Sequence, residues 1–275
     1  SGLIAKEISN ELNIPFIFTS HSLGVFLDGY NKERVDCEKI VMTSSNLVTT
    51  SSVFETMLIG DTYKIDENKI KKIIPGVDRK IFIPDSSVEK ENIILSIGRI
   101  QKQKGQIQTL EFLNNFKKIE EDFKCYFIGG PSGKNGNEYL NELKQSVEEF
   151  NLNTHVEFLD TLPQTEIIDL FKKAKLMIHT SQFETFGLVA IEANAMGVPV
   201  LTTNNGSLME IIENNKNGYL SESLLDGNVN NFVNNLFNDN AKYEEIFSSC
   251  IEKSKKYDWA KTTDELESLY KQLVG

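Results

Sequence analysis

The sequence contains little cysteine, and its three cysteines, Cys37, Cys125 and Cys250, lie far apart. This spacing matches neither a metal-binding motif nor a disulfide framework. We therefore predict free thiols in a reducing, cytoplasmic environment. The three histidines are equally dispersed, and neither an H-E-x-x-H nor an Asp-x-Asp motif occurs. We accordingly expect no metal and no other cofactor.

Positive charge and long apolar runs are also scarce. The chain has 29 Lys and Arg residues against 40 Asp and Glu, a formal net charge of −11 and an isoelectric point near 4.9. Nucleic-acid phosphates require a basic surface, so no nucleic-acid partner is expected. No stretch approaches the ~18 apolar residues of a membrane-spanning helix, so no membrane span is predicted.

Two glycine-rich phosphate-binding motifs are missing as well. The dinucleotide fingerprint G-x-G-x-x-G does not occur. Residues 129–134 read GGPSGK, but Ile128 stands where a P-loop needs its first glycine. Asn135 replaces the Ser or Thr that would hold Mg²⁺ there. The sequence therefore predicts neither a P-loop nor a nicotinamide or flavin site.

Short apolar runs alternate with amphipathic helical patterns along most of the chain. This alternation is typical of α/β proteins, in which helices cover both faces of a parallel sheet. Such sheets bind ligands at the carboxyl ends of their strands. The predicted strands are Pro15–Thr19, Asn46–Ser51, Lys71–Ile74, Asn92–Ile97, Lys124–Ile128, Val156–Leu159, Leu176–Thr180 and Pro199–Thr203. The predicted helices between them are Lys104–Lys118, Glu138–Phe150, Gln164–Lys173, Leu188–Met196 and Glu210–Asn214.

The chain is expected to form two domains, separated by a turn-rich stretch from Pro75 to Ser87. The sequence does not begin with Met, and Ser1 opens directly into a helical pattern. We therefore expect it to be part of something longer. The predicted organisation is a first domain over residues 1–80, a second over residues 81–245 and closing helices over residues 246–275.

The most informative segment joins a strand that ends near Thr180 to a helix that begins near Gly187. The first N–H groups of this helix, at Gly187, Leu188 and Val189, lack intrahelical acceptors and point back toward the loop. Helix N-termini bind phosphate through such groups and through the helix dipole. Gly187 has no side chain to prevent close approach. This segment therefore predicts a phosphate-binding cradle.

Two carboxylates, Glu184 and Glu192, flank the cradle. If the intervening chain were helical throughout, they would lie ~12 Å apart along its axis. This exceeds the ~5–9.5 Å separation of glycosidase acid/base pairs. The spacing favours two ends of an elongated ligand, such as a nucleoside diphosphate sugar. The alternative is that both are solvent-facing charges, but apolar neighbours surround Glu192 in the sequence.

A second segment places Gly98 and Arg99 after a strand and Lys104 and Gly105 before the next helix. Two cations at such a turn would face the same ligand-binding cleft. Arginine is rare in this lysine-rich chain, and its planar guanidinium suits phosphate oxygens. We interpret both cations as phosphate ligands, while solvated loop charges remain the alternative.

In combination these motifs resemble those of the family-4 retaining glycosyltransferases, near the sucrose-phosphate-synthase-like branch. The resemblance covers nearly the whole chain. It implies a GT-B fold with a complete C-terminal Rossmann-like domain and a partial N-terminal one. The matching segments are His21-Ser-Leu-Gly24, Pro75-Gly-Val-Asp78 with Phe82-Ile-Pro84, Gly98-Arg99 with Lys104-Gly105, Glu184 to Glu192 around Phe186-Gly187-Leu188, and Gly206 with Glu210-Ile-Ile.

The resemblance also implies roles for individual residues. Arg99 and Lys104, at the Gly98 turn, would bind the diphosphate, and Glu192 would bind the ribose. Glu184 would contact the donor sugar, and His21 would lie near the reaction centre. Phe186 and the backbone of Gly187–Val189 complete the expected donor site. The implied reaction moves a hexose from a UDP-linked sugar to a hydroxyl acceptor, with retention at the anomeric carbon.

The chain departs from the family at its N-terminal side. The sequence shows no counterpart of the family's glycine-rich loop, and by usual domain size we expect roughly 100 residues of that domain to be missing. The stretch from Val25 to Asp28 replaces one that carries Lys or Arg in the family. We therefore expect a homo-oligomer or a partner chain to cover the partial domain, and activity of this chain alone is open. The alternative functions are a non-catalytic nucleotide-sugar-binding subunit and a sugar-nucleotide 2-epimerase.

Overall fold

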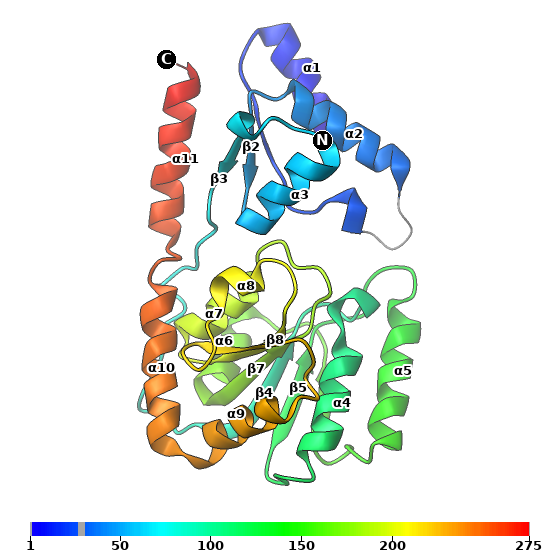
Figure 1. Ribbon diagram of the computed structural model, residues 1–275, viewed down its shortest axis with the longest axis vertical. Helices are drawn as coiled ribbons and strands as arrows, with labels where there is room; N and C mark the ends of the chain where they lie inside the picture. The colour runs from blue at the N-terminus through cyan, green and yellow to red at the C-terminus, as the bar shows by residue number, and fades with distance from the viewer. Residues whose placement is uncertain (1, 27–30, 275) are drawn as a thin grey trace. The chain divides into compact units, whose positions relative to one another are not determined.

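The computed structural model describes residues 2–26 and 31–274 (Figure 1). The chain forms two compact units. One unit comprises the residues up to Gly76 together with those from Tyr257 onward, and the other comprises Val77–Lys256. No helix within the described residues is long and apolar enough to cross a membrane.

The second unit is built on a parallel sheet of six strands. From β4 the chain moves outward through β5 and β6, returns to the other side of β4 as β7, and continues outward through β8 and β9. The carboxyl ends of β4 and β7 thus form a topological switch point, where open α/β sheets bind ligands. In spatial order the strands are β6 (Val156–Leu159), β5 (Lys124–Ile128), β4 (Glu91–Ile97), β7 (Ala174–His179), β8 (Val200–Thr203) and β9 (Gly218–Ser221).

One apolar core fixes the central strands of this sheet. It unites α4 (Gln106–Phe116), α5 (Gly136–Glu149) and α9 (Gly227–Asn238) with the buried faces of the strands. Phe116 is fully buried and stacks on Phe112 with ring centroids 5.4 Å apart. Burying each such side chain stabilises the fold by roughly 1.5–3 kcal/mol. The strand ends that carry polar residues therefore project from a rigid base.

Four further helices complete the second unit. They are α6 (Gln164–Lys173), α7 (Leu188–Ala195), α8 (Leu208–Ile211) and α10 (Asn240–Ser254). The segment α10 packs against α7. Since α7 begins immediately beyond the switch point, α10 supports the helix whose N-terminus faces the carboxyl ends of the strands.

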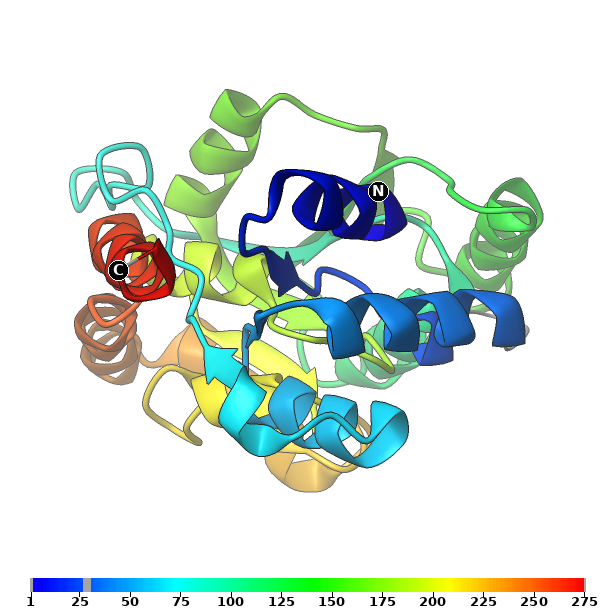
Figure 2. The ribbon, with the colours of Figure 1, turned by 90° about the horizontal axis from the view of Figure 1, so that it is seen from above.

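The first unit has a smaller parallel sheet of β1 (Ile17–Thr19), β2 (Leu47–Thr50) and β3 (Ile70–Lys72), in that spatial order. Within this unit α1 packs beside α2, as the dark-blue and blue helices of Figure 2 show. The Thr262 hydroxyl of α11 donates a 2.7 Å hydrogen bond to the carbonyl of Ile74. The helices are α1 (Gly2–Leu12), α2 (Lys32–Ser44), α3 (Val53–Tyr63) and α11 (Trp259–Val274).

The sequence locates most of these elements correctly. The α/β class is confirmed, each of the eight predicted strands overlaps an observed one, and α6 has the predicted bounds. The strand β9 was not predicted, because it is short and Asn-rich sequence precedes it. The predicted boundary near residue 80 lies close to the observed division after Gly76. The predicted closing segment is divided, because α10 belongs to the second unit and α11 to the first.

Candidate functional site

The turn after β4 is held tightly against its neighbours. The N–H of Gly98 donates to the carbonyl of Ile128 at 2.9 Å, so the turn continues the pairing of β4 with β5. The 3-10 helix Lys102–Lys104 follows and ends at Gly105, which has φ +66°. A Cβ at Gly105 would lie 2.3 Å from the carbonyl oxygen of Thr180, just beyond β7. Glycine is therefore required here, and it lets the turn approach the end of β7.

This approach brings Lys104 to Glu184, far along the sequence. The ammonium of Lys104 lies 3.0 Å from Glu184 Oε2, and His179 Nε2 lies 3.0 Å from the same oxygen. The Glu184 side chain is 15% exposed. Burial alone would raise the pKa of Glu184, but the hydrogen bond and charge of His179 and the charge of Lys104 lower it to about 2. Glu184 is therefore a carboxylate at any physiological pH.

A glycine also determines where α7 begins. Gly187 precedes the helix with φ +89°, and a Cβ there would lie 2.6 Å from Leu208 Cδ2. The carbonyl of Gly187 accepts from the N–H of Ala190 at 2.9 Å, whereas the N–H groups of Leu188 and Val189 come too early in the helix for an intrahelical acceptor. These two groups and the helix dipole form an anion-binding position.

The loop after β8 holds the loop that precedes α7 through hydrogen bonds. The N–H of Ser207 donates to the carbonyl of Glu184 at 3.1 Å, and the Ser207 hydroxyl donates to it at 3.2 Å. Gly206 has φ +62°, and a Cβ there would lie 2.3 Å from that same carbonyl oxygen. Phe186 is buried. The loop therefore holds the Glu184 backbone in one position.

Glu192 lies in the second turn of α7 and differs from Glu184 in its surroundings. Burial raises its pKa, and within the described residues its carboxylate has no hydrogen bond or ion pair. The separation of ~12 Å between the Glu184 and Glu192 carboxylates assumed that the chain between them is helical throughout. That assumption was wrong, because α7 begins only at Leu188. The axial rise from Leu188 to Glu192 is ~6 Å.

Arg99 and His21 complete the predicted set. The carbonyl of Arg99 accepts from Gln106 Nε2 at 2.9 Å, and its guanidinium is exposed with no ion pair among the described residues. His21 is exposed in the first unit, two residues beyond β1. The following loop is fixed, because the N–H of Gly24 donates to both Glu38 oxygens at 2.9 and 3.1 Å. Of the stretch from Val25 to Asp28, Leu27 and Asp28 lie outside the described residues.

His179 was not among the predicted site residues, because it belongs to no motif of the sequence. It is the last residue of a strand whose six residues are all buried. A polar side chain at that end of a buried parallel strand was the available signal. Among the described residues no group of three or more His, Cys, Asp or Glu side chains is arranged to hold a metal ion.

The low pKa of Glu184 predicts how stability depends on pH. Because the folded-state pKa of about 2 lies below the ordinary glutamate pKa of 4.5, ionised Glu184 stabilises the fold above pH 4.5, and this contribution is lost as the pH falls toward 2. It is on the order of 3 kcal/mol. We expect the wild type to unfold at higher denaturant concentration than Glu184→Gln at pH 7, with the difference shrinking below pH 4.5. Equal pH dependence of the two proteins would contradict the ion cluster.

Each of the two units is built on its own parallel sheet, and the larger one has glycine-dependent turns at its switch point. This architecture is that of the GT-B glycosyltransferases, whose solved structures are compared below. The family model described as glycosyl transferases group 1 matches residues 78–256, and the chain belongs to this family. The matched region covers the second unit and includes Arg99, Lys104, Glu184 and Glu192.

Named relatives extend the similarity beyond the matched region. D-inositol 3-phosphate glycosyltransferase of Corynebacterium urealyticum is 25% identical over 99% of this chain and 69% of its own length. Mannosylfructose-phosphate synthase of Agrobacterium fabrum is 26% identical over 77% of this chain and 53% of its own length. The chain thus spans only part of each relative, and it is a glycosyltransferase by its family.

Solved structures show the same fold. The HepE protein of Anabaena, in complex with UDP and glucose, superposes with a TM-score of 0.85 at 19% identity, covering 99% of this chain and 75% of that one. Sucrose-phosphate synthase of Thermosynechococcus elongatus gives a TM-score of 0.85 at 24% identity, covering 99% and 71% of the two chains. These similarities confirm the predicted GT-B fold.

Proposed function

We propose that this glycosyltransferase uses a UDP-linked hexose as donor, and that Glu192 binds its ribose. The observation that carries the proposal is the unpaired, half-buried carboxylate of Glu192, on the helix whose first N–H groups face the switch point. Burying a charge without a partner is costly unless a ligand supplies one. Vicinal ribose hydroxyls are suitable donors to a carboxylate.

The remaining predicted residues fit the other parts of such a donor. Arg99 and Lys104 project from the turn after β4 and supply positive charge for a diphosphate. The N–H groups of Leu188 and Val189 supply the helix-terminal donors. Glu184, fixed and ionised beside Lys104, is placed to accept hydrogen bonds from sugar hydroxyls. HepE was captured with UDP and glucose, and the proposed ligand class follows that precedent.

We further propose that transfer proceeds with retention. The acceptor hydroxyl attacks the anomeric carbon on the face from which the diphosphate departs. The bond between that carbon and the phosphate oxygen breaks, and the hydroxyl proton passes to the departing phosphate oxygen. Arg99, Lys104 and the α7 N-terminus would stabilise the negative charge that grows on the diphosphate. These cations take the role that a divalent metal plays in other transferases, so the proposal includes no metal.

We propose that the acceptor is a sugar or another hydroxyl compound, and that His21 lies beside it when it binds.

A cytoplasmic location is proposed from the thiols, since Cys125 and Cys250 are fully buried and free. A second copy or a partner chain is proposed to cover the first unit, because α1 exposes large apolar side chains such as Ile4 and Leu12. Light scattering of the purified protein would test for such a copy.

Because Glu192 is proposed to bind the ribose and Glu184 the sugar, substitutions of the two residues should affect the binding of UDP and UDP-glucose differently. Glu192→Gln should weaken UDP and UDP-glucose alike by about 10- to 100-fold, because ribose is common to both. Glu184→Gln should weaken the binding of UDP-glucose but leave the binding of UDP nearly unchanged.

Because burial raises the pKa of Glu192, its charge opposes folding at neutral pH. Glu192→Gln should therefore unfold at the same or a higher temperature than the wild type.

Isothermal titration calorimetry with both ligands measures these differences in binding. Glu138→Gln, which removes an exposed carboxylate on α5, serves as the matched control and should bind both ligands like the wild type. Unchanged affinity of Glu192→Gln for UDP would remove this residue from the site. An equal loss for both ligands in Glu184→Gln would show that the two ends are assigned wrongly. Conversion of UDP-glucose to an epimer would contradict the transferase proposal itself.

A further inference from the structure

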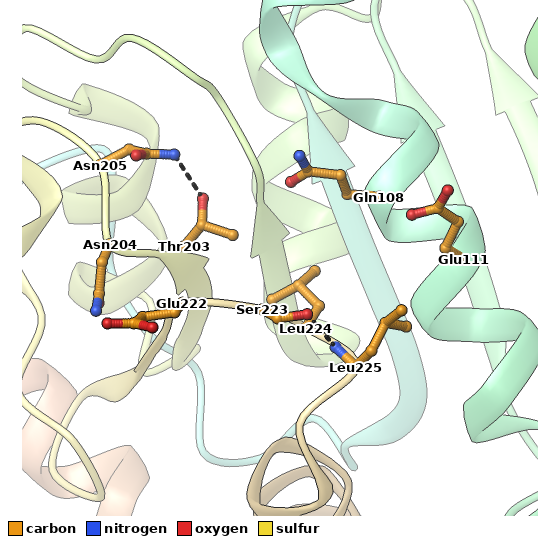
Figure 3. A pocket seen from close by; sticks show the side chains of 9 residues that line it. All are labelled: Gln108, Glu111, Thr203, Asn204, Asn205, Glu222, Ser223, Leu224 and Leu225. Carbon is orange, nitrogen blue, oxygen red and sulfur yellow. Dashed lines mark hydrogen bonds between the residues drawn. The ribbon is translucent and has the colours of Figure 1, made fainter.

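A hollow in the larger unit is lined by residues other than those assigned to the donor. It has a volume of about 450 Å³ and lies at the carboxyl ends of β8 and β9, between the loops that follow these strands and the side of α4 (Figure 3). Pockets of ~300–1,000 Å³ are the usual size for small-molecule ligands. None of the described residues that line it belongs to the predicted donor site.

Its lining is polar and acidic. Gln108 and Glu111 come from α4, Asn204 and Asn205 follow β8, and Glu222 follows β9. Neither Glu111 nor Glu222 forms an ion pair with another described residue. Lysine and arginine are absent from the described lining. Phosphates, nucleotides and other anions would meet only negative charge here, so this hollow does not extend a phosphate site.

One atom of the lining lacks a partner. Gln108 extends from α4 toward the segment that carries Thr203 and Asn205, as Figure 3 shows. Its Oε1 is shielded from solvent and has no hydrogen-bond partner. A buried acceptor left unpaired is unfavourable, and rotation of the carboxamide would present it to a donor in the hollow. This state of Gln108 indicates a ligand that brings hydrogen-bond donors.

We propose that this hollow binds an uncharged sugar unit. Carboxylates and carboxamides accept from and donate to neighbouring hydroxyls, and all the polar groups around the hollow are of these kinds or hydroxyls. Leu224 and Leu225 line the hollow as well and offer apolar contact to the C–H groups of a sugar ring. A divalent cation fits less well, since no group of three or more candidate metal ligands occurs among the described residues.

The position gives the sugar site a use in the reaction. The loop that contributes Asn204 and Asn205 continues to Ser207, which holds the carbonyl of Glu184. The sugar site and the candidate donor site therefore share one loop. A glycosyltransferase that extends a glycan needs to hold sugar units beyond the reacting one, and the hollow provides such a place on the loop that also supports Glu184. This inference rests on membership of the glycosyltransferase family and adds a second carbohydrate site to it.

The test measures sugar binding with the donor site both empty and filled. Maltose, sucrose and N-acetylglucosamine are titrated into the 275-residue chain, with and without saturating UDP, and binding is followed by saturation-transfer-difference NMR and calorimetry. At least one sugar should bind saturably in both conditions. Glu222→Gln and Gln108→Leu should weaken it by about tenfold or more. Asn204→Ala, an exposed change, should weaken it too, whereas Glu138→Gln should not.

The outcomes separate this site from the donor site. No saturable binding of any of the three sugars, binding that saturating UDP abolishes, or binding that the cavity variants leave unchanged would overturn the inference. Binding of Ca²⁺ or spermidine in the hollow, with no sugar bound, would also overturn it. A failure of UDP to bind would contradict the proposed donor site and leave sugar binding as a separate measurement. Circular dichroism of each variant identifies those that fail to fold, and Asn204→Ala then decides the result.

Discussion

Lys104→Ala is expected to lower kcat by about 10²- to 10³-fold while KM for the donor changes little. The ammonium of Lys104 lies beside Glu184 at the switch point, and its proposed target is charge that grows on the departing diphosphate. Interactions that strengthen toward the transition state act on kcat. The measurement is release of UDP from UDP-glucose, against a panel of sugar acceptors, in a form of the protein that turns over.

Lys102→Ala is the matched control for this experiment. Lys102 lies two residues earlier in the same turn, but its side chain is 58% exposed and pairs with Glu142 on α5. An exposed pair of this kind contributes at most about 1 kcal/mol. Turnover of Lys102→Ala should therefore stay within about twofold of the wild type. If Lys104→Ala changed only KM, Lys104 would be an ordinary binding residue with no part in stabilising the leaving group.

Gly105→Ala is expected to destabilise the protein by roughly 2–5 kcal/mol, because it combines a left-handed backbone with a steric clash. The added Cβ would lie 2.3 Å from the carbonyl oxygen of Thr180. The backbone must then move away from β7, and this shift separates Lys104 from Glu184. UDP binding should weaken together with stability. Urea unfolding and calorimetry measure the two effects.

Gly60→Ala is a control substitution with the opposite expected effect on folding stability. Gly60 lies in the interior of α3, and a Cβ there would meet no atom within 4 Å. Alanine favours the helix over glycine by ~1 kcal/mol, so this variant should be as stable as the wild type or more so. If Gly105→Ala were as stable as Gly60→Ala, the turn after β4 would not need its glycine, and the account of how Lys104 is positioned would be wrong.

Local sequence locates the strand and the helix that carry the candidate site, because neighbouring residues give the signal. Glu184, Gly187 and Glu192 lie within one strand-to-helix connection, so their order along the chain already indicates a cradle with a carboxylate on each side. The strands are equally accessible to prediction, because their apolar runs are nearly continuous and buried. The helix start at Leu188 depends on the left-handed backbone of Gly187, and local sequence locates it correctly.

Contacts between distant segments could not be predicted in this way. Lys104 and Glu184 are 80 residues apart, and their pairing depends on the packing of Gly105 against Thr180. His179 belongs to the same cluster because β7 ends there, which no spacing motif reveals. The sugar hollow joins α4 to the loops after β8 and β9, and β9 itself escaped prediction. Polar residues on three separate segments give no periodic pattern.

The most direct test of the account is a crystal structure of this protein with UDP. We expect the diphosphate to lie against the N–H groups of Leu188 and Val189, with Lys104 within hydrogen-bonding distance of a phosphate oxygen. We expect the ribose hydroxyls to donate to the carboxylate of Glu192. Clear density for UDP elsewhere in the second unit, with Glu192 still unpaired, would contradict the account.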